Sequence, residues 1–466
     1  MSENKKFAET YGGKIGAALP IITMFLGIIL LSTQNMTGAK NLWSAGLAGI
    51  MVGMFVYKDK NRFQEAVFNG LRSKPYIITV CAFYFAGILA QFLSAGHLVD
   101  GLLYVVSLSK IPTYLLPVIS FLICVVLSCA TGTTGGTVST VAPVMIPLAV
   151  TLGCHPGLIC GAILGGSFFG DNLAPISDTT IISATTQETS VIKVVRSRFK
   201  YSIIGGVFSA IMFVVMGIRT TDASVAETIV VDATYAPSLA FLVIPVIIMI
   251  MMVKGYNLVQ ALMTTNLIAL IIFIALGYGS VDAICGSSGV VASGISGMAN
   301  AATFMFFIYI VVNIIREAGV LERILSGVKL VAKTARSAEI MAGCITLVGS
   351  LLIGGATSTM SMVGAVIREL LKPFKIARDR SANILDGMCC GVGGLLPHNS
   401  SAVLLSGLAI SSGLVAEGFS PLDFLFYNYH CMALVAIYWF AVLSGWGRKY
   451  ETDEELAADG IFIETK

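Results

Sequence analysis

Long apolar segments follow one another along almost the whole of this chain, and only short polar stretches separate them. A helix needs about 20 apolar residues to cross a bilayer, and segments 76–98 and 424–446 reach that length. Of the 466 residues, 56% are hydrophobic and 12% are charged, whereas a soluble protein has roughly 25% charged residues. The sequence therefore predicts an all-α polytopic membrane protein with about twelve to fourteen spanning or half-spanning segments.

One polar interruption differs sharply from its apolar flanks. Residues 165–183 read GGSFFGDNLAPISDTTIIS and place two acids, Asp171 and Asp178, beside several glycines and Pro175. A charge at the bilayer centre costs roughly 2.5–3.5 kcal/mol on the lenient insertion scale, so such residues usually mark an ion or substrate path. Irregular backbone at membrane depth is tolerated only where protein or a cavity covers it. This stretch is therefore predicted to be a break between two half-helices and part of a transport site.

The chain resembles itself when it is shifted by 222 residues, which is the separation of Pro175 and Pro397. The same shift places Gly354 on Gly132, at the starts of GGATSTMSMV and GTTGGTVSTV. Interrupted spans at matching positions of two halves are typical of a repeat-built transporter whose binding site lies at the breaks. The sequence thus predicts two copies of one unit, each containing two broken or re-entrant helices.

The distribution of basic residues predicts how the two copies are oriented. Residues 58–74 contain five Lys or Arg, whereas their counterparts 280–296 contain none. The bias is reversed elsewhere, since 368–380 contain five and the matching 146–158 contain none. Residues 191–200 add four more to the first copy. Because basic loops stay in the cytoplasm, the matched loops change side, which predicts inverted-topology repeats with both termini in the cytoplasm.

The repeat and the charge bias together define five predicted regions. These are a cytoplasmic N-terminal tail (1–14), transmembrane repeat 1 (15–218), an extracytoplasmic linker (219–236), the inverted transmembrane repeat 2 (237–446) and a cytoplasmic C-terminal tail (447–466). A multi-pass chain of this kind is expected in a bacterial-type cytoplasmic membrane, where the lipid bilayer is its first partner.

The predicted breaks carry side chains suited to small ions. Carboxylate, hydroxyl, amide and carbonyl oxygens are the hard ligands that such cations prefer, and the positive ends of half-helices can hold an anionic group. Only the first half brings acids to its break, because Asp171 and Asp178 align with Gly393 and Ser400. The charged half is therefore predicted to bind the coupling ion, and the neutral half is predicted to bind the substrate.

Candidate residues follow from this division. Those of the first half are the two acids, expected to hold Na+, and the hydroxyls of Thr133, Thr134 and Thr137. Those of the second half are Thr357, Ser358, Thr359, His398, Asn399 and Ser400. Simpler roles stay open: Asp178 can cap a half-helix, the Thr/Gly stretches can be helix-packing surfaces, and His398 can be a satisfied polar group.

Three other classes of function fit this sequence poorly. The net charge of +3 is small and dispersed, which argues against a nucleic-acid partner. The chain has no paired-histidine motif, nucleotide loop or nucleophile–base pair, so an enzyme is not expected. A channel is a further hypothesis, but the apolar segments show no ring of charges that would line a pore.

At residues 170–180, the sequence GDNLAPISDTT resembles the signature of the NhaC family of Na+/H+ antiporters, within the ion transporter superfamily. The TGTTGGT stretch at 131–137 is similar to the Thr/Gly break that precedes this signature in the family. The resemblance implies sodium-linked transport through a helical bundle with re-entrant elements, and it makes a homodimer the expected oligomer. The ion-site residues that it implies here are Asp171, Asn172, Ser177, Asp178 and Thr179.

The second half departs from this pattern, because LLPHNSSAV at 395–403 is more similar to the Pro-His motif of gluconate-type and related organic-acid or amino-acid permeases. In the leading hypothesis the protein is a secondary active transporter that exchanges Na+ for H+. The two ions compete at Asp171 and Asp178, and no cofactor besides them is expected. In the alternative, Na+ or H+ drives symport or exchange of a small organic acid or amino acid.

Overall fold

The computed structural model describes residues 7–34, 36, 39–109, 111–222, 224–225, 233–320 and 332–452. Within these ranges the chain is helical, and β-structure is limited to two isolated bridges, Thr10–Tyr57 and Ile376–Tyr450. By length and composition, eight described helices can cross a membrane, or up to ten if each of two bent pairs forms one span. Four shorter apolar helices accompany them. The prediction of an all-α polytopic membrane protein is confirmed.

The first half of the chain contributes ten α-helices to the described structure. They are α1 (Gly13–Thr33), α2 (Ala39–Val56), α3 (Lys60–Leu71), α4 (Lys74–Ala95), α5 (Leu98–Ser109), α6 (Leu116–Thr131), α7 (Thr134–Thr151), α8 (Pro156–Leu173), α9 (Asp178–Thr186) and α10 (Val191–Thr220). A short 3₁₀ turn, η1 (Thr113–Leu115), leads directly into α6. The predicted break at 165–183 lies between α8 and α9, where the helix axis bends by 41°.

The second half follows the same order of elements. Its helices are η2 (Ala233–Leu242) running into α12 (Val243–Val253), α13 (Leu258–Ala275), α14 (Val281–Cys285), α15 (Val290–Glu317), α17 (Ala335–Ile353), α18 (Ala356–Leu371), α19 (Arg378–Gly393), α20 (Ser400–Ser411) and α21 (Tyr429–Ser444). Helices α18, α19 and α20 each begin 222 residues after α7, α8 and α9, which is the shift that superimposes Pro397 on Pro175.

Local sequence explains where the matched helices stop. Helix α6 ends at Gly132 with φ of 66°, and α17 ends at Gly354 with φ of 76°. This left-handed conformation is easy for glycine and costly for residues with a Cβ atom. A Cβ atom on Gly354 would also lie 2.5 Å from a ring carbon of His398, and one on Gly132 would lie 2.9 Å from the backbone nitrogen of Ser177. In each half, the end of one broken element therefore touches the start of the other.

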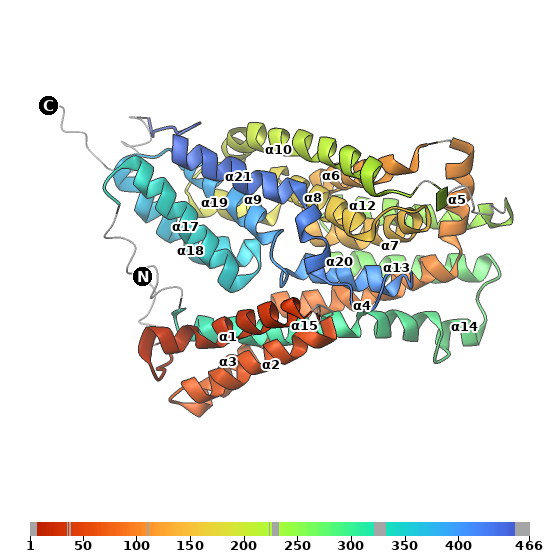
Figure 1. The fold of residues 1–466 in the computed structure, drawn as a ribbon, viewed down its shortest axis with the longest axis horizontal. Helices are drawn as coiled ribbons and strands as arrows, with labels where there is room; N and C mark the ends of the chain where they lie inside the picture. The colour runs from red at the N-terminus through yellow and green to blue at the C-terminus, as the bar shows by residue number, and fades with distance from the viewer. Residues whose placement is uncertain are drawn as a thin grey trace.

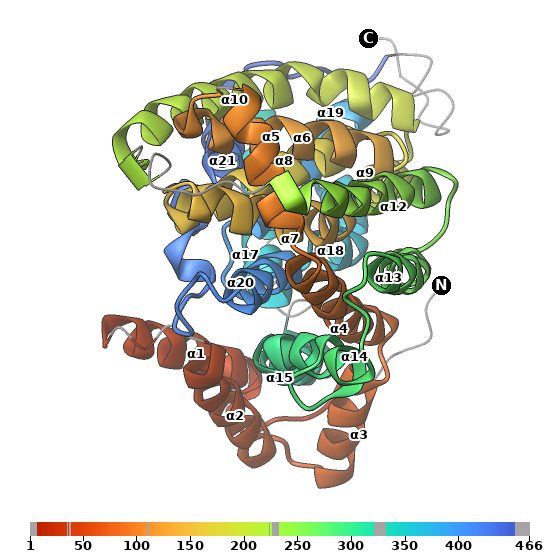
Figure 2. The ribbon, with the colours of Figure 1, turned by 90° about the vertical axis from the view of Figure 1, so that its right-hand side faces the viewer.

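The helices assemble into two groups. Helices α1, α2, α3, α4 and α15 pack on one another and occupy the lower part of Figures 1 and 2. The larger group contains α6 to α10, α17 to α19 and α21. Helices α7 and α20 pack against each other, and both also contact α4 of the smaller group, while α20 contacts α15 as well. The two broken elements represented by α7 and α20 therefore lie at the boundary between the groups.

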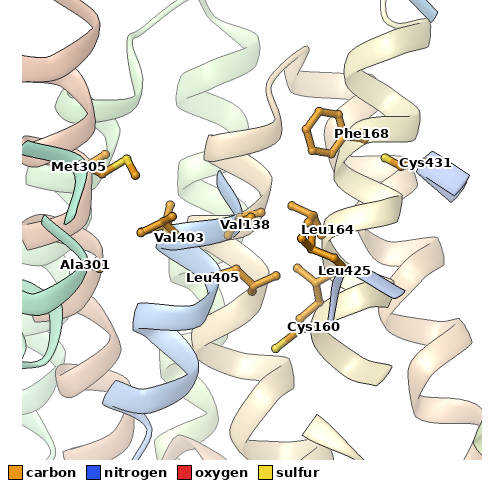
Figure 3. Close-up of a cluster of buried hydrophobic side chains, with 14 of the residues drawn as sticks. Val138, Cys160, Leu164, Phe168, Ala301, Met305, Val403, Leu405, Leu425 and Cys431 are labelled. Atoms are coloured by element: carbon orange, nitrogen blue, oxygen red, sulfur yellow. The ribbon is translucent and has the colours of Figure 1, made fainter. Parts of the chain in front are cut away.

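Apolar packing fixes α20 at this boundary. Figure 3 shows Val403 of α20 between Met305 of α15 on one side and Val138 of α7 on the other, while Leu405 lies on the side of Leu164 and Leu425. Each of these side chains is 8% exposed or less within the chain. Because interiors are packed as densely as organic crystals, this contact positions the polar residues at the start of α20 against those at the start of α7.

Three arginines that the charge count placed in loops are buried in protein. Residues 191–200 form the first turns of α10, and the side chain of Arg198 is fully buried in an ion pair with Asp386 of α19, at 2.8 Å. Arg380 is fully buried and pairs with Glu339 of α17 at 2.9 Å. Arg368 is 3% exposed. The prediction that residues 191–200 are loop was wrong, because Arg198 finds a buried carboxylate far away in the sequence.

The two predicted tails and the linker are only partly within the described residues. Residues 1–6, 223, 226–232 and 453–466 lie outside them. The first part of the C-terminal region is held to the bundle, since Glu451 pairs with Arg368 at 2.8 Å and its backbone nitrogen donates to the carbonyl of Lys375.

Candidate functional site

A cavity of about 380 Å³ lies between the two helix groups, and all four broken elements line it. The first half contributes Gly132, Thr133, Thr134 and Gly135 from the α6–α7 break and Asp171, Asp178 and Thr179 from the α8–α9 break. The second half contributes Gly355, Ala356, Thr357 and Ser358 from the α17–α18 break and Asn399, Ser400 and Ser401 from the α19–α20 break. Residues of α4, including Lys74, and Tyr309 of α15 form the opposite wall.

Of the two acids that line this cavity, Asp171 makes the most hydrogen bonds. It lies in the last turn of α8 and is 9% exposed. The hydroxyl of Thr134 donates to its Oδ2 atom at 2.7 Å, and the hydroxyl of Ser177 donates to its Oδ1 atom. The Thr179 hydroxyl lies 2.8 Å from that of Ser177 and donates to the Asp171 carbonyl at 3.1 Å. Two hydroxyl groups from two breaks thus donate to one carboxylate, and a third bonds the main chain of the same residue.

Asp178 has a different environment seven residues further on. It is exposed, lines the same cavity and makes no hydrogen bond or ion pair with the residues that the structure describes. Ser177, and not Asp178, is the N-cap residue of α9, and its hydroxyl accepts from the backbone nitrogen of Thr179 at 3.2 Å. The alternative that Asp178 caps the half-helix is therefore wrong. Its carboxylate remains available to a ligand in the cavity.

The remaining hydroxyls of the α6–α7 break serve the backbone. Thr133 lines the cavity and caps α7, where its hydroxyl accepts from the nitrogen of Gly136. Thr137 donates to the carbonyl of Thr133 at 2.9 Å and is absent from the lining of the cavity. A threonine inside a helix commonly bonds the carbonyl four residues earlier. The structure therefore brings Thr133 and Thr134, but not Thr137, to the cavity.

Asn172 points away from the cavity into a buried polar cluster. Its amide nitrogen donates to Oδ1 of Asp386 at 3.0 Å, and its amide oxygen accepts from Ser202 at 2.8 Å. Asp386 in turn accepts from Ser183 at 2.8 Å and pairs with Arg198, whose guanidinium also donates to the Asn172 carbonyl. This cluster supports the α8–α9 break from behind, because it fixes the residue that follows Asp171.

Sequence reasoning missed the importance of this cluster. Arg198 lay in a basic run that resembled a solvated loop. Asp386 offered the better signal, since it is an acid inside an apolar segment, and such residues are almost always paired.

The candidates of the second half divide between the cavity and a smaller pocket. Thr357, Ser358, Asn399 and Ser400 line the cavity. Thr359 is buried, and its hydroxyl lies 3.5 Å from the Gly349 carbonyl, within the packing of α17 and α18. Asn399 caps α20 through its amide oxygen and donates to the Gly354 carbonyl at 3.0 Å. His398 and the hydroxyls of Ser358 and Ser400 line the smaller pocket.

The chemistry of the cavity is that of an oxygen-rich, negatively charged site. Two carboxylates and several hydroxyls face one space, and hard cations are bound by such oxygen ligands. Among the described residues there is no group of three or more His, Cys, Asp or Glu that could hold a metal ion. The carboxylate and hydroxyl oxygens that line the cavity are ligands of the kind that small hard cations prefer.

Known antiporters resemble this chain in sequence. The sequence profile of the Na+/H+ antiporter family matches residues 12–218 and again residues 219–446. A malate-2H+/Na+-lactate antiporter of Bacillus subtilis is 36% identical over 174 residues, which are 37% of this chain and 36% of that protein. The Na+/H+ antiporter NhaC of Alkalihalophilus pseudofirmus is 25% identical over 231 residues, covering 48% of this chain and 49% of that protein.

An arginine/ornithine antiporter, ArcD of Halobacterium salinarum, is 31% identical over 93 residues, which are 20% of this chain and 19% of that protein. The chain thus aligns with half or less of the length of each of these curated relatives. Their names span cation exchange and the exchange of organic solutes.

Proposed function

Because this chain belongs to the Na+/H+ antiporter family, we propose that it is a secondary active transporter that exchanges Na+ for H+ across the cytoplasmic membrane. The observation that carries this proposal is the pair of acids, Asp171 and Asp178, on one break and facing one cavity. Intramembrane carboxylates of this kind commonly form the ion or proton path of a transporter. Na+ and H+ are the coupling ions, and both are cargo.

The hydroxyls around Asp171 suit a carboxylate that alternates between two occupants. A hydroxyl can donate one hydrogen bond and offers two acceptor lone pairs. Thr134 and Ser177 donate to Asp171 here, and rotation of the same hydroxyls presents their oxygens to Na+. Protonation removes the negative charge that attracts the cation, so the two ions compete for the carboxylate. We propose Asp178, whose carboxylate makes no hydrogen bond with the described residues and lines the same cavity, as a second ligand.

The repeat arrangement belongs to the same proposal. We divide the chain into repeats at 15–218 and 237–446, inverted relative to each other, with both termini in the cytoplasm. The two consecutive family matches and the identical offset of three pairs of helix starts support this division. Since the cavity lies between two helix groups, relative movement of the groups would open it to alternate sides. A homodimer is proposed as the assembly.

A second candidate function has its own support. The second half brings hydroxyls and an amide, but no acid, to the cavity. The Bacillus subtilis relative named as a malate-2H+/Na+-lactate antiporter is 36% identical to part of this chain. We therefore propose, as the alternative, that Na+ or H+ drives symport or exchange of a small organic acid or amino acid.

Proteoliposomes that contain the purified protein and a trapped pH-sensitive dye test both functions. An inward Na+ gradient alone is expected to alkalinise the lumen, because it drives protons outward. An inward K+ gradient is expected to have no such effect. The Asp171→Asn, Asp178→Asn double variant should lose the signal, while Asp282→Asn, an exposed acid of α14, should keep it. A dye response that requires an added organic acid or amino acid would instead establish the alternative function.

A further inference from the structure

A second, smaller pocket of about 130 Å³ lies beside the cation cavity. The two spaces share Pro75, Tyr309, Gly355, Ser358 and Ser400 as lining residues. Helix α15 forms one wall of the smaller pocket, and the breaks of the second half form the other. Among the residues that the structure describes, no acid lines this pocket. A ligand here would sit next to a cation in the larger cavity without facing a carboxylate.

His398 is the polar group that most requires a partner in this pocket. It is 2% exposed and lines the pocket, and Phe25 packs its ring edge-on at a centroid distance of 5.1 Å. The Leu351 backbone lies nearby, but neither ring nitrogen makes a hydrogen bond of normal geometry with the described residues. A buried donor or acceptor left unsatisfied is destabilising. The imidazole N–H is therefore available to a ligand that accepts hydrogen bonds.

The N-terminus of α18 supplies further donors at the same place. Its N-cap residue is Gly355, which provides no side-chain cap, whereas the matching helix α7 is capped by Thr133. The first backbone N–H groups of a helix have no partner within the helix, and together with the helix dipole they attract anions. Ser358, in this first turn, and Ser400 line the pocket with hydroxyls that bond no described residue. The break that carries these donors lies against His398, because a Cβ atom on Gly354 would come within 2.8 Å of the Nε2 atom of His398.

The rest of the pocket defines the shape and charge of its ligand. Most of its lining area is apolar, with Met305, Ile308 and Val312 of α15 among the contributors. Arg316, one turn further along α15, is exposed and also lines it. An engineered cavity of about 150 Å³ accommodates benzene, so a pocket of this size accepts about six non-hydrogen atoms. Molecules as large as arginine are too big for it.

We propose that this pocket binds a small monocarboxylate. The carboxylate accepts hydrogen bonds from His398, from the Ser358 hydroxyl and from the first N–H groups of α18, and Arg316 contributes positive charge. The short carbon chain packs against the apolar side chains of α15. This inference rests on the alternative function proposed above and deepens it, since it names the class of organic solute that would be carried. A bound cation in the adjacent cavity would favour the anion electrostatically, and the anion would favour the cation equally.

The test is equilibrium binding to the purified full-length protein by calorimetry, in the presence of Na+. The probes are lactate and propionate, with succinate as the dicarboxylate and arginine as a larger solute. Saturable binding of the monocarboxylates is expected, with affinity for succinate and arginine at least about tenfold weaker. Replacing Na+ by K+ should weaken the binding of lactate.

Three variants locate the site. His398→Ala should weaken lactate binding about tenfold or more, and Arg316→Gln, an exposed position, should weaken it about three- to tenfold. Val312→Phe, which fills the pocket with an apolar ring, should abolish binding without changing any polar group. His155→Gln is the matched control, because His155 is an exposed residue at the start of α8, outside both pockets. It should bind lactate as the unmodified protein does.

The proposal is overturned if no monocarboxylate binds saturably, if succinate binds as tightly as lactate, or if Arg316→Gln and Val312→Phe leave lactate binding unchanged. Na+-driven dye responses of the same preparations, recorded without any carboxylate, report separately on the proposed cation exchange. Lactate binding that is lost in Val312→Phe, together with an absent Na+/H+ response, would support the pocket and refute the exchange.

Discussion

The breaks of the two halves use the same backbone devices and carry different chemistry. In both halves a left-handed glycine, Gly132 or Gly354, ends the first helix, and a polar N-cap residue, Ser177 or Asn399, starts the last one. The chemical difference lies in the side chains, since the residue aligned with Asp171 in the second half is a glycine, Gly393. A repeat can therefore keep its backbone geometry while a few substitutions bring carboxylates to the break of one half only.

The comparison also reveals one feature without a counterpart. The buried pair of Arg198 and Asp386 joins the first half to the second, but the shift of 222 residues places Ser420 and Leu164 at the aligned positions. The pair lies behind the charged break, because Asn172 bonds Asp386 and Arg198 donates to the Asn172 carbonyl. The break that carries the acids is thus also the one that a buried ion pair stabilises.

Breaking this support should have the largest effect on stability. Arg198→Met leaves the fully buried Asp386 without its cation, and loss of one partner of a buried ion pair costs about 3–5 kcal/mol. The double variant Arg198→Met, Asp386→Leu removes both charges and should recover most of that loss. The measurement is the free energy of unfolding of the purified protein in an SDS titration. If the double variant is as unstable as the single one, the pair does not act through charge.

The second largest effect should appear in ion binding. Asp171→Asn keeps the size of the side chain and removes the charge to which Thr134 and Ser177 donate, which should weaken Na+ binding about 100-fold, equivalent to about 2.7 kcal/mol. Stabilisation of the protein against heat by added Na+ measures this loss. The aligned change Gly393→Ala, in the half without acids, should leave Na+ affinity within about twofold. Equal losses in both variants would show that the two halves do not divide their roles.

Part of this organisation was predictable from the sequence, because its signals are local. Glycine, proline and acidic residues within an apolar segment mark a break wherever they occur, so the α8–α9 break and its partner at Pro397 could be located. The shift of 222 residues predicted corresponding helix starts for the same reason. The all-helical fold followed from the length and composition of the apolar segments.

The pairing of distant residues could not be predicted, since it depends on packing. Asn172 and Asp386 are 214 residues apart, and no periodic pattern connects them. Arg198 sits in a run of basic residues whose composition is the same whether the run is a loop or the first turns of a helix. Likewise, Thr137 and Thr359 cannot be told from the neighbouring threonines in the sequence. In the structure, however, Thr137 bonds the Thr133 carbonyl in its own helix, and the Thr359 hydroxyl faces the Gly349 carbonyl of α17.

The two left-handed glycines give a further, smaller comparison. Alanine costs about 1–2 kcal/mol in this conformation, so Gly132→Ala and Gly354→Ala should each destabilise the protein by at least this amount. At Gly354 the added Cβ meets the ring of His398, whereas at Gly132 it meets the backbone of Ser177 as closely as the side chain of Ile176, so that removing the Ile176 side chain leaves the backbone contact. Combining Gly354→Ala with His398→Ala should therefore recover part of the loss, whereas Gly132→Ala with Ile176→Ala should not. Free energies of unfolding in SDS are measured for the single and double variants. If the losses of Gly354→Ala and His398→Ala simply add in the double variant, the predicted clash between the new Cβ and the His398 ring is wrong.

The smallest expected effect separates capping from ion binding at the two matched N-cap residues. Ser177→Ala and Asn399→Ala each remove a side chain that accepts from the first turn of the following helix, and each should cost about 1 kcal/mol of stability. Ser177 also donates to Asp171, so its loss should weaken Na+ binding about three- to tenfold, while Asn399→Ala should leave Na+ binding nearly unchanged. Thermal stabilisation by Na+ measures the difference. Equal Na+ affinities in the two variants would mean that Ser177, like Asn399, only caps its helix, and that Asp171 relies on Thr134 alone among the side chains that bond its carboxylate.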